Sequence, residues 1–152
     1  MVYEKNGDLL DCGADAICHQ VNFAGAMGGG VALAIREHVL TRRDYQQYVD
    51  ECRAKGADLL GTVLALPGHD KQGNFVTVFN LFSQRANFQT DYTALLDCLT
   101  EVEDICARLN KTVALPYGMG CGIAIGDWAT VRRIIDKVFA HSPVLCTIVR
   151  KV

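Results

Sequence analysis

The sequence lacks several features that mark large classes of protein. No apolar run is long enough to span a bilayer, and residues 1–5 do not show the basic and then apolar pattern of a secretion signal. Only 3 prolines occur, and no low-complexity tract, internal repeat or Pro/Ser-rich linker divides the chain. A chain of 152 residues is large enough to bury a core, so we expect a single domain over residues 1–152 with no membrane partner.

The chain also lacks a strong net charge of either sign. Its net charge is −2 and its pI is about 6.0, so no overall basic field attracts a nucleic-acid backbone. A local basic strip would have to come from Arg42-Arg43, Arg85 or Arg132-Arg133, which are typical of solvated helix faces. The charge balance therefore argues against a nucleic-acid partner, although a short basic channel would permit one. We further expect a monomer whose partner is a small molecule.

The cysteines do not form a disulfide or metal-binding pattern. Their number is odd, they are scattered along the chain, and no C-x-x-C pair occurs. No set of histidines, cysteines and carboxylates has metal-ligand spacing either. We expect a cytoplasmic protein with no metal site and no cofactor, in which most cysteines are core residues.

Short apolar segments, many of them β-branched, alternate with segments of helical periodicity. The expected strands are 2–4, 16–21, 60–66, 75–81, 112–115 and 144–149, and the expected helices are 31–39, 42–54, 92–109 and 128–138. The helix over 31–39 is apolar almost all round and should be largely buried. This alternation predicts an α/β protein with helices on both faces of a sheet. Ligands in such folds bind beyond the carboxyl ends of the strands, so residues 22–30, 83–84 and 118–122 are expected to line one cleft.

Two glycine-rich stretches each stand between a strand-like and a helix-like segment. They are Ala26-Met27-Gly28-Gly29-Gly30-Val31 and Tyr117-Gly118-Met119-Gly120-Cys121-Gly122-Ile123. Clustered glycines indicate close approach of a ligand or another backbone, and loops that lead into helix N-termini suit phosphate. No Gly-Lys-Ser/Thr follows the first, and the second lacks the glycine spacing of a dinucleotide fingerprint. The pair therefore predicts a diphosphate held from both sides.

These loops resemble the ligand loops of macro domains, which are ADP-ribose-binding modules. The first runs from His19-Gln20-Val21-Asn22 to Val31-Ala32, and the second from Ala114-Leu115-Pro116-Tyr117 to Gly126-Asp127-Trp128. Gly7-Asp8-Leu9 and Asn80-Leu81-Phe82-Ser83-Gln84 match as well. The chain is most similar to small bacterial and phage macro proteins, and beyond them to the yeast ADP-ribose-1″-phosphate phosphatase and the terminal ADP-ribose protein glycohydrolase group. The resemblance implies a three-layer α/β/α macro domain with a mixed six-stranded sheet.

The same resemblance implies where the ligand is held. Asp8 and Leu9 would contact the adenine, Asn22 the distal ribose, and the amides of the two glycine loops the diphosphate. The implied ligand-binding residues are Asp8, Leu9, Asn22, Gly28, Gly29, Gly30, Val31, Ser83, Gln84, Tyr117, Gly118, Met119, Gly120, Cys121, Gly122 and Ile123. For some of them a structural role is the alternative: an Asx turn at Asn22, a polar strand end at Ser83 and Gln84, and packing at Cys121.

The chain departs from related hydrolases at the residues that matter for catalysis. Ser83 and Ala124 stand where the terminal ADP-ribose glycohydrolases have a lysine and an aspartate, and Ala32 stands where another branch has an aspartate. His19 matches a histidine of the yeast-type phosphatase, and an imidazole titrates near neutral pH, so His19 is the candidate acid–base residue. Asn22 is the candidate for orienting the ribose or a water. The alternative for His19 is a strand histidine satisfied by a backbone partner.

The resemblance therefore predicts an ADP-ribose-binding protein that hydrolyses a derivative at the distal ribose. The substrate would be ADP-ribose-1″-phosphate or an ADP-ribosyl adduct. Two alternatives stay open, namely a non-catalytic ADP-ribose reader and an enzyme that removes ADP-ribose from nucleic acid.

Overall fold

The computed structural model describes residues 1–122 and 124–152, which are organised around a mixed sheet of six strands. The strands are β1 (Val2–Asn6), β2 (Ala16–Val21), β3 (Val63–His69), β4 (Phe75–Phe82), β5 (Val113–Pro116) and β6 (Cys146–Arg150). Their order in space is β1-β6-β5-β2-β4-β3, and every neighbouring pair is parallel except β3 and β4. The mixed six-stranded sheet expected from the resemblance is confirmed.

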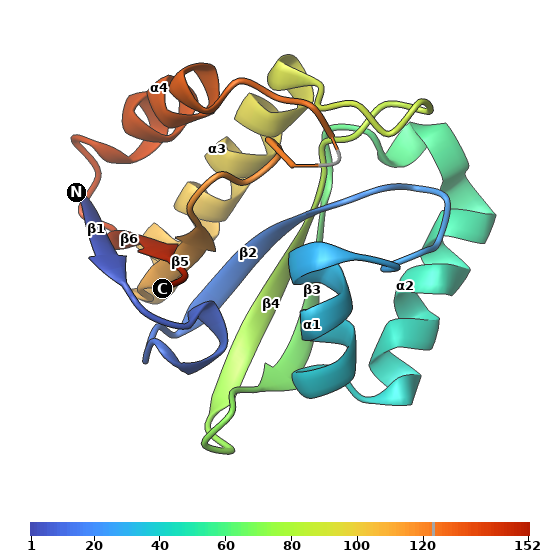
Figure 1. Cartoon of the computed structure of the whole chain (residues 1–152), viewed down its shortest axis with the longest axis horizontal. Helices are drawn as coiled ribbons and strands as arrows, with labels where there is room; N and C mark the ends of the chain where they lie inside the picture. Colours follow the sequence, from blue (N-terminus) through green and yellow to red (C-terminus); the bar gives the residue numbers. More distant parts are fainter. Residues whose placement is uncertain (123) are drawn as a thin grey trace.

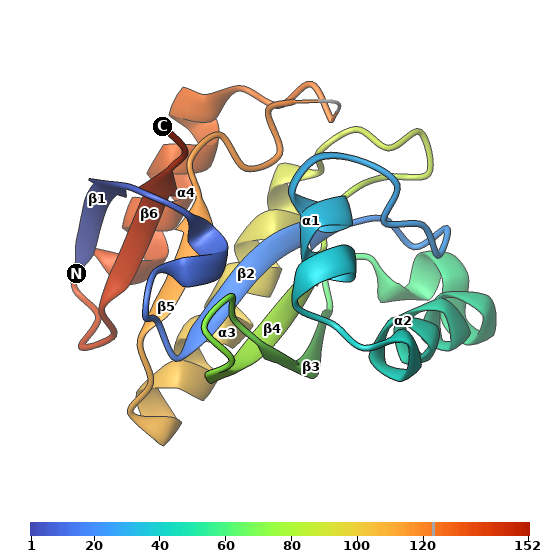
Figure 2. The same cartoon turned by 60° about the horizontal axis from the view of Figure 1, so that its bottom comes forward.

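In the described part of the chain, four α-helices cover the two faces of this sheet (Figures 1 and 2). They are α1 (Gly30–His38), α2 (Arg42–Lys55), α3 (Tyr92–Leu109) and α4 (Trp128–Phe139). Helices α1 and α2 pack in one apolar core, and α3 and α4 pack in the other. Two 3-10 turns, Leu9–Asp11 and Gly56–Leu59, add to the expected elements. The three-layer α/β/α arrangement is therefore confirmed.

Strand β2 lies between the two cores and directs polar side chains to both. Successive side chains of a strand point to opposite faces. Cys18 packs in the core under α3 and α4, whereas Ile17 and Val21 pack in the core under α1 and α2. His19 therefore points toward the α1 layer and Gln20 toward the α3 layer.

The burial of α1 differs from the expectation of a largely buried helix. Ile35 is its only fully buried residue in the described structure, and Val31 is 40% exposed. The expectation was wrong because α1 contacts the sheet along one stripe only, while its first turn borders an open cavity. The apolar composition of this helix thus leaves hydrophobic surface beside a candidate site.

The cysteines are all free in this structure, and five of the seven are buried. No helix within residues 1–122 and 124–152 combines the length and the apolar character needed to cross a membrane.

Candidate ligand-binding site

A cavity of about 300 Å³ opens where β2, β4 and β5 end. These strands are parallel, so their carboxyl ends meet at one edge of the sheet, where ligands bind in open α/β folds. The described residues that line it are His19, Gln20, Gly29, Gly30, Val31, Ala32, Gln84, Pro116, Tyr117, Gly118, Met119, Gly120, Gly122 and Ala124. The structure therefore brings both glycine loops and the end of β4 to one cavity.

The N-terminus of α1 at this cavity differs from those of the other described α-helices. Its N-cap is Gly29, which offers no side-chain hydrogen bond, and no acidic residue lies in its first turn. The other three helices are capped by Thr41, Asp91 and Asp127, whose side chains each accept from a backbone N–H of the first turn. The first N–H groups of α1 have no acceptor within the helix, and the helix dipole is positive there. This end of α1 is therefore suited to bind an anion.

The second glycine loop adopts a conformation that needs glycine at two positions. Gly118 and Gly120 both have φ of 77°, in the left-handed region. A Cβ at Gly120 would lie 2.9 Å from Oγ1 of Thr90, and a Cβ at Gly126 would lie 2.4 Å from the carbonyl oxygen of Gly120. The loop is therefore closely packed against its surroundings, and side chains at these positions would displace it.

A network of side-chain hydrogen bonds holds this loop to the sheet. The Thr90 hydroxyl donates to the carbonyl of Gly120 at 2.7 Å and accepts from Nε2 of Gln20 at 3.0 Å. Nε2 of Gln84 in turn donates to Oε1 of Gln20 at 3.0 Å. Thr90 itself is nearly fully buried, so its hydroxyl is well shielded from water. Thr90 is not among the residues predicted for the site, because its partner Gly120 lies 30 residues away in the sequence.

His19 lies deep in the wall of the cavity and is 1% exposed. Its Nε2 lies 2.6 Å from Oδ1 of Asn80 on the neighbouring strand β4. Burial lowers the pKa of His19 to about 4, although the hydrogen bond to Asn80 acts in the opposite direction. The imidazole is therefore neutral near pH 7. Asn80 belongs to a segment that carries the family resemblance, but its partnership with His19 depends on the register of β2 and β4.

Asn22 organises its own loop and does not line the cavity. Its Nδ2 donates to the carbonyl of Ala26 at 2.8 Å, and its Oδ1 accepts from the backbone N–H of Ala24 at 3.1 Å. The hydroxyl of Tyr48 donates to the Asn22 carbonyl at 2.6 Å. These are the contacts of the Asx-turn alternative. A contact of Asn22 with a ligand stays a prediction.

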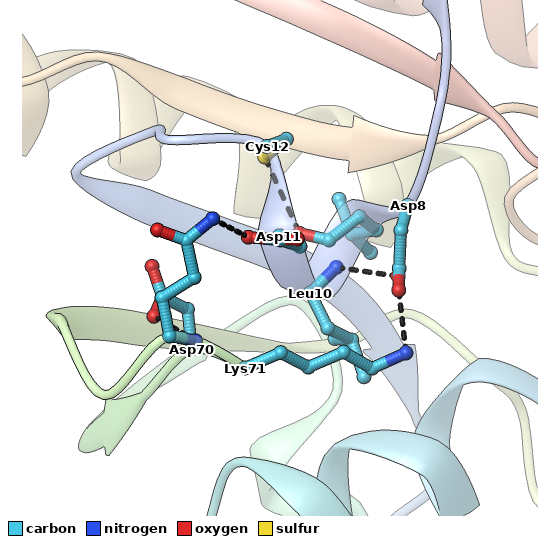
Figure 3. Close-up of polar contacts among 8 residues, drawn as sticks. Asp8, Leu10, Asp11, Cys12, Asp70 and Lys71 are labelled. Atoms are coloured by element: carbon cyan, nitrogen blue, oxygen red, sulfur yellow. Dashed lines mark hydrogen bonds and ion pairs between the residues drawn. The ribbon is translucent and has the colours of Figure 1, made fainter.

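Asp8 and Leu9 also lie outside the lining of this cavity. The Asp8 carboxylate caps the 3-10 turn by accepting from the Leu10 N–H at 3.0 Å, and it forms an ion pair with Lys71 of the β3–β4 hairpin (Figure 3). The hydrogen bond from Lys71 is the main cause that lowers the pKa of Asp8. Leu9 is buried in the core under α1. A contact of this turn with adenine stays a prediction.

Some of the remaining predicted residues do not line the cavity. Gly28, Ser83 and Cys121 are not part of the described lining, and Ile123 lies outside the described residues. Burial raises the pKa of the Cys121 thiol, which keeps it protonated, as a packing role requires.

The cavity lining is neutral in the part of the chain that the structure describes. It contains no Asp, Glu, Lys or Arg. Ala32 and Ala124, which the resemblance aligns with carboxylates of related hydrolases, both line the cavity. Nor do the described residues gather three histidines, cysteines or carboxylates as metal ligands would be gathered. The described lining can therefore contact a ligand only through backbone groups and neutral side chains.

This chain belongs to the macro domain family. The family model of the Macro domain matches residues 18–135. No curated protein sequence matches the chain.

Several solved structures share its fold. A protein from Bacteroides thetaiotaomicron has a TM-score of 0.84 at 23% identity, over 100% of this chain and 98% of that one. The macrodomain of Mycobacterium tuberculosis DarG has a TM-score of 0.79 at 22% identity, over 99% of this chain and 97% of that one. Thermosipho africanus DarTG in complex with ADP-ribose has a TM-score of 0.77 at 15% identity, over 97% of this chain and 41% of that one.

Proposed function

We propose that this macro domain binds ADP-ribose, with the diphosphate between the N-terminus of α1 and the second glycine loop. The observation that carries the proposal is the N-terminus of α1, which has no side-chain cap and whose first turn lines the cavity. The described lining of this cavity contains no carboxylate that would repel an anion. An anion at a helix N-terminus gains about 0.3–1 kcal/mol, and up to about 2 kcal/mol when partly buried. Charge-assisted bonds from the loop amides add to this gain. The structure of DarTG with ADP-ribose, part of which has the same fold as this chain, supports this choice of ligand.

The rest of the ligand would extend to the two turns that flank the cavity. Asp8 would accept from the exocyclic amine of adenine, beside Leu9, because a carboxylate has acceptor sites beyond the two that Lys71 and Leu10 use. Asn22 would hold the distal ribose through the loop that it organises. Both contacts require the ligand to span from the 3-10 turn to the first glycine loop.

We further propose that the bound compound is hydrolysed at its distal ribose. For ADP-ribose-1″-phosphate, water attacks phosphorus, the bond from phosphorus to the ribose oxygen breaks, and ADP-ribose and phosphate leave. His19 would accept a hydrogen bond from the reacting groups and Asn22 would position the ribose. A histidine with a pKa of about 4 is a weak base, so most of the rate would come from positioning and from backbone N–H groups.

A non-catalytic reader is the second candidate, and a specific observation favours it. Alanine occupies both carboxylate positions in the lining, and His19 is buried and neutral. A cavity of this kind holds an anion through its backbone but offers little acid–base chemistry.

Calorimetric titration with ADP-ribose tests the binding, with Gly29→Asp as the matched variant. The aspartate would cap α1 and place a negative charge where the diphosphate is proposed, so binding should be lost while the fold is retained. If the wild-type protein does not bind ADP-ribose, or if Gly29→Asp binds it equally well, the proposal is refuted. Release of phosphate from ADP-ribose-1″-phosphate, and of ADP-ribose from modified protein and modified DNA, then separates an enzyme from a reader.

A further inference from the structure

The imidazole of His19 has one ring nitrogen that is paired and one that is not. Nε2 lies 2.6 Å from Oδ1 of Asn80, whereas Nδ1 is buried and has no hydrogen-bond partner among the described residues. Buried polar atoms in folded proteins nearly always have a partner. Because His19 also lines the cavity, its unpaired nitrogen indicates that a bound ligand supplies the missing hydrogen-bond partner.

Asn80 determines which of the two nitrogens carries the proton. Its Nδ2 donates to the carbonyl oxygen of Leu64 at 2.8 Å and to that of Val78 at 3.4 Å. These bonds orient the amide so that Oδ1 faces His19, and a carbonyl oxygen only accepts. Nε2 of His19 therefore carries the proton. In the neutral ring, Nδ1 is then an acceptor that has no hydrogen to donate.

We propose that Nδ1 of His19 accepts a hydrogen bond from a hydroxyl of the bound ligand, and that Asn80 is the positioning residue that keeps this nitrogen unprotonated. The proposal rests on the proposed function, in which the distal ribose supplies the hydroxyl. An anionic phosphate oxygen only accepts, so it does not pair with Nδ1. The site thus assigns the hydroxyl-bearing part of the ligand to His19 and its anionic part to the backbone amides of α1.

A matched pair of variants, His19→Leu and His19→Asn, tests the acceptor. Both side chains branch at Cγ, but Asn can place an oxygen at the δ position where histidine has Nδ1, and Leu has only carbon there. The Kd for ADP-ribose should rise about tenfold in His19→Leu and stay within about threefold of wild type in His19→Asn, as expected for one hydrogen bond. ADP, which lacks the distal ribose, should bind wild type and both variants equally.

Loss of both ligands in His19→Leu would show general damage to the site and overturn the proposal, as would an unchanged Kd for ADP-ribose. In either case wild-type binding of ADP-ribose leaves the proposed function intact. If the wild-type protein binds neither ligand, the proposed function itself is refuted, and this inference with it.

Imidazole ¹⁵N NMR of the wild-type protein provides a test that does not depend on a variant folding. At pH 7, Nε2 of His19 should be protonated and Nδ1 unprotonated, and the Nδ1 resonance should shift on addition of ADP-ribose but not of ADP. A proton on Nδ1, or an Nδ1 resonance that ADP-ribose leaves unchanged, would overturn the proposal. In Asn80→Leu the acceptor for the Nε2 proton is removed, so the other tautomer should become populated and the affinity for ADP-ribose should fall.

Discussion

Acid should destabilise the folded protein through His19. In the unfolded chain this histidine takes up a proton near its ordinary pKa of 6.5, whereas in the folded protein burial lowers the pKa to about 4. Between these two values the unfolded state binds more protons, so the free energy of unfolding falls as the pH is lowered from about 6.5 to about 4. The loss from His19 alone amounts to about 2 kcal/mol at pH 5 and about 3 kcal/mol at pH 4.

Urea unfolding of wild type and His19→Asn at pH 7 and pH 5 measures this loss. Wild type should lose about 2 kcal/mol more than the variant over this interval, because asparagine does not titrate and all other groups are shared. The substitution also changes the free energy of unfolding by an amount that does not depend on pH. The quantity to compare is therefore the loss in free energy of unfolding between pH 7 and pH 5 in each protein. Parallel losses in the two proteins would refute the reasoning, since they would mean that folded His19 takes up a proton as readily as the unfolded chain does.

The remaining predictions concern the two glycine loops and use urea unfolding together with ADP-ribose titration. Gly29→Asp should leave the stability within about 0.5 kcal/mol of wild type, because glycine is itself a fair N-cap, while it abolishes binding; a variant that binds ADP-ribose or is strongly destabilised contradicts this. Gly126→Ala should cost about 1–3 kcal/mol and weaken binding, because its Cβ would lie 2.4 Å from the Gly120 oxygen. Gly28→Ala, whose Cβ meets nothing within 4 Å, is its control and should change stability by less than about 0.5 kcal/mol. Thr90→Val keeps the shape but removes the hydroxyl bonded to Gly120, and should cost about 1–3 kcal/mol; an unchanged stability would show that the network does not hold the loop.

Local pattern in the sequence was sufficient for most of the secondary structure. Strand β2 was predicted with the bounds that the structure has, Ala16–Val21, because four of its six residues are apolar, as in a strand covered on both faces. The expected strand over 60–66 begins later, at Val63, since Gly61 adopts a φ of 86° in the turn that precedes it. That turn closes with a bond from the Thr62 N–H to the Leu59 carbonyl, which strand propensity does not reveal.

The absence of a cap at α1 is also readable in the sequence once the helix start is known. Ser, Thr, Asp and Asn are the usual caps, and Gly28-Gly29-Gly30 contains none of them. Whether the uncapped end borders a cavity or bulk solvent is not a local property. It follows from the parallel run of β2, β4 and β5, which places three loops at the same edge of the sheet.

The sequence by itself determined the α/β class, the macro domain resemblance and the two glycine loops, because each of these depends on residues close together in the chain. Only the tertiary structure decided which polar groups meet. Asn80 pairs with His19 from 61 residues away, and Lys71 pairs with Asp8 from 63 residues away. Such partners are selected by strand order and register, which arise from the packing of the whole sheet. Which nitrogen of His19 carries the proton is therefore decided by the fold, although the histidine itself could be identified from the sequence.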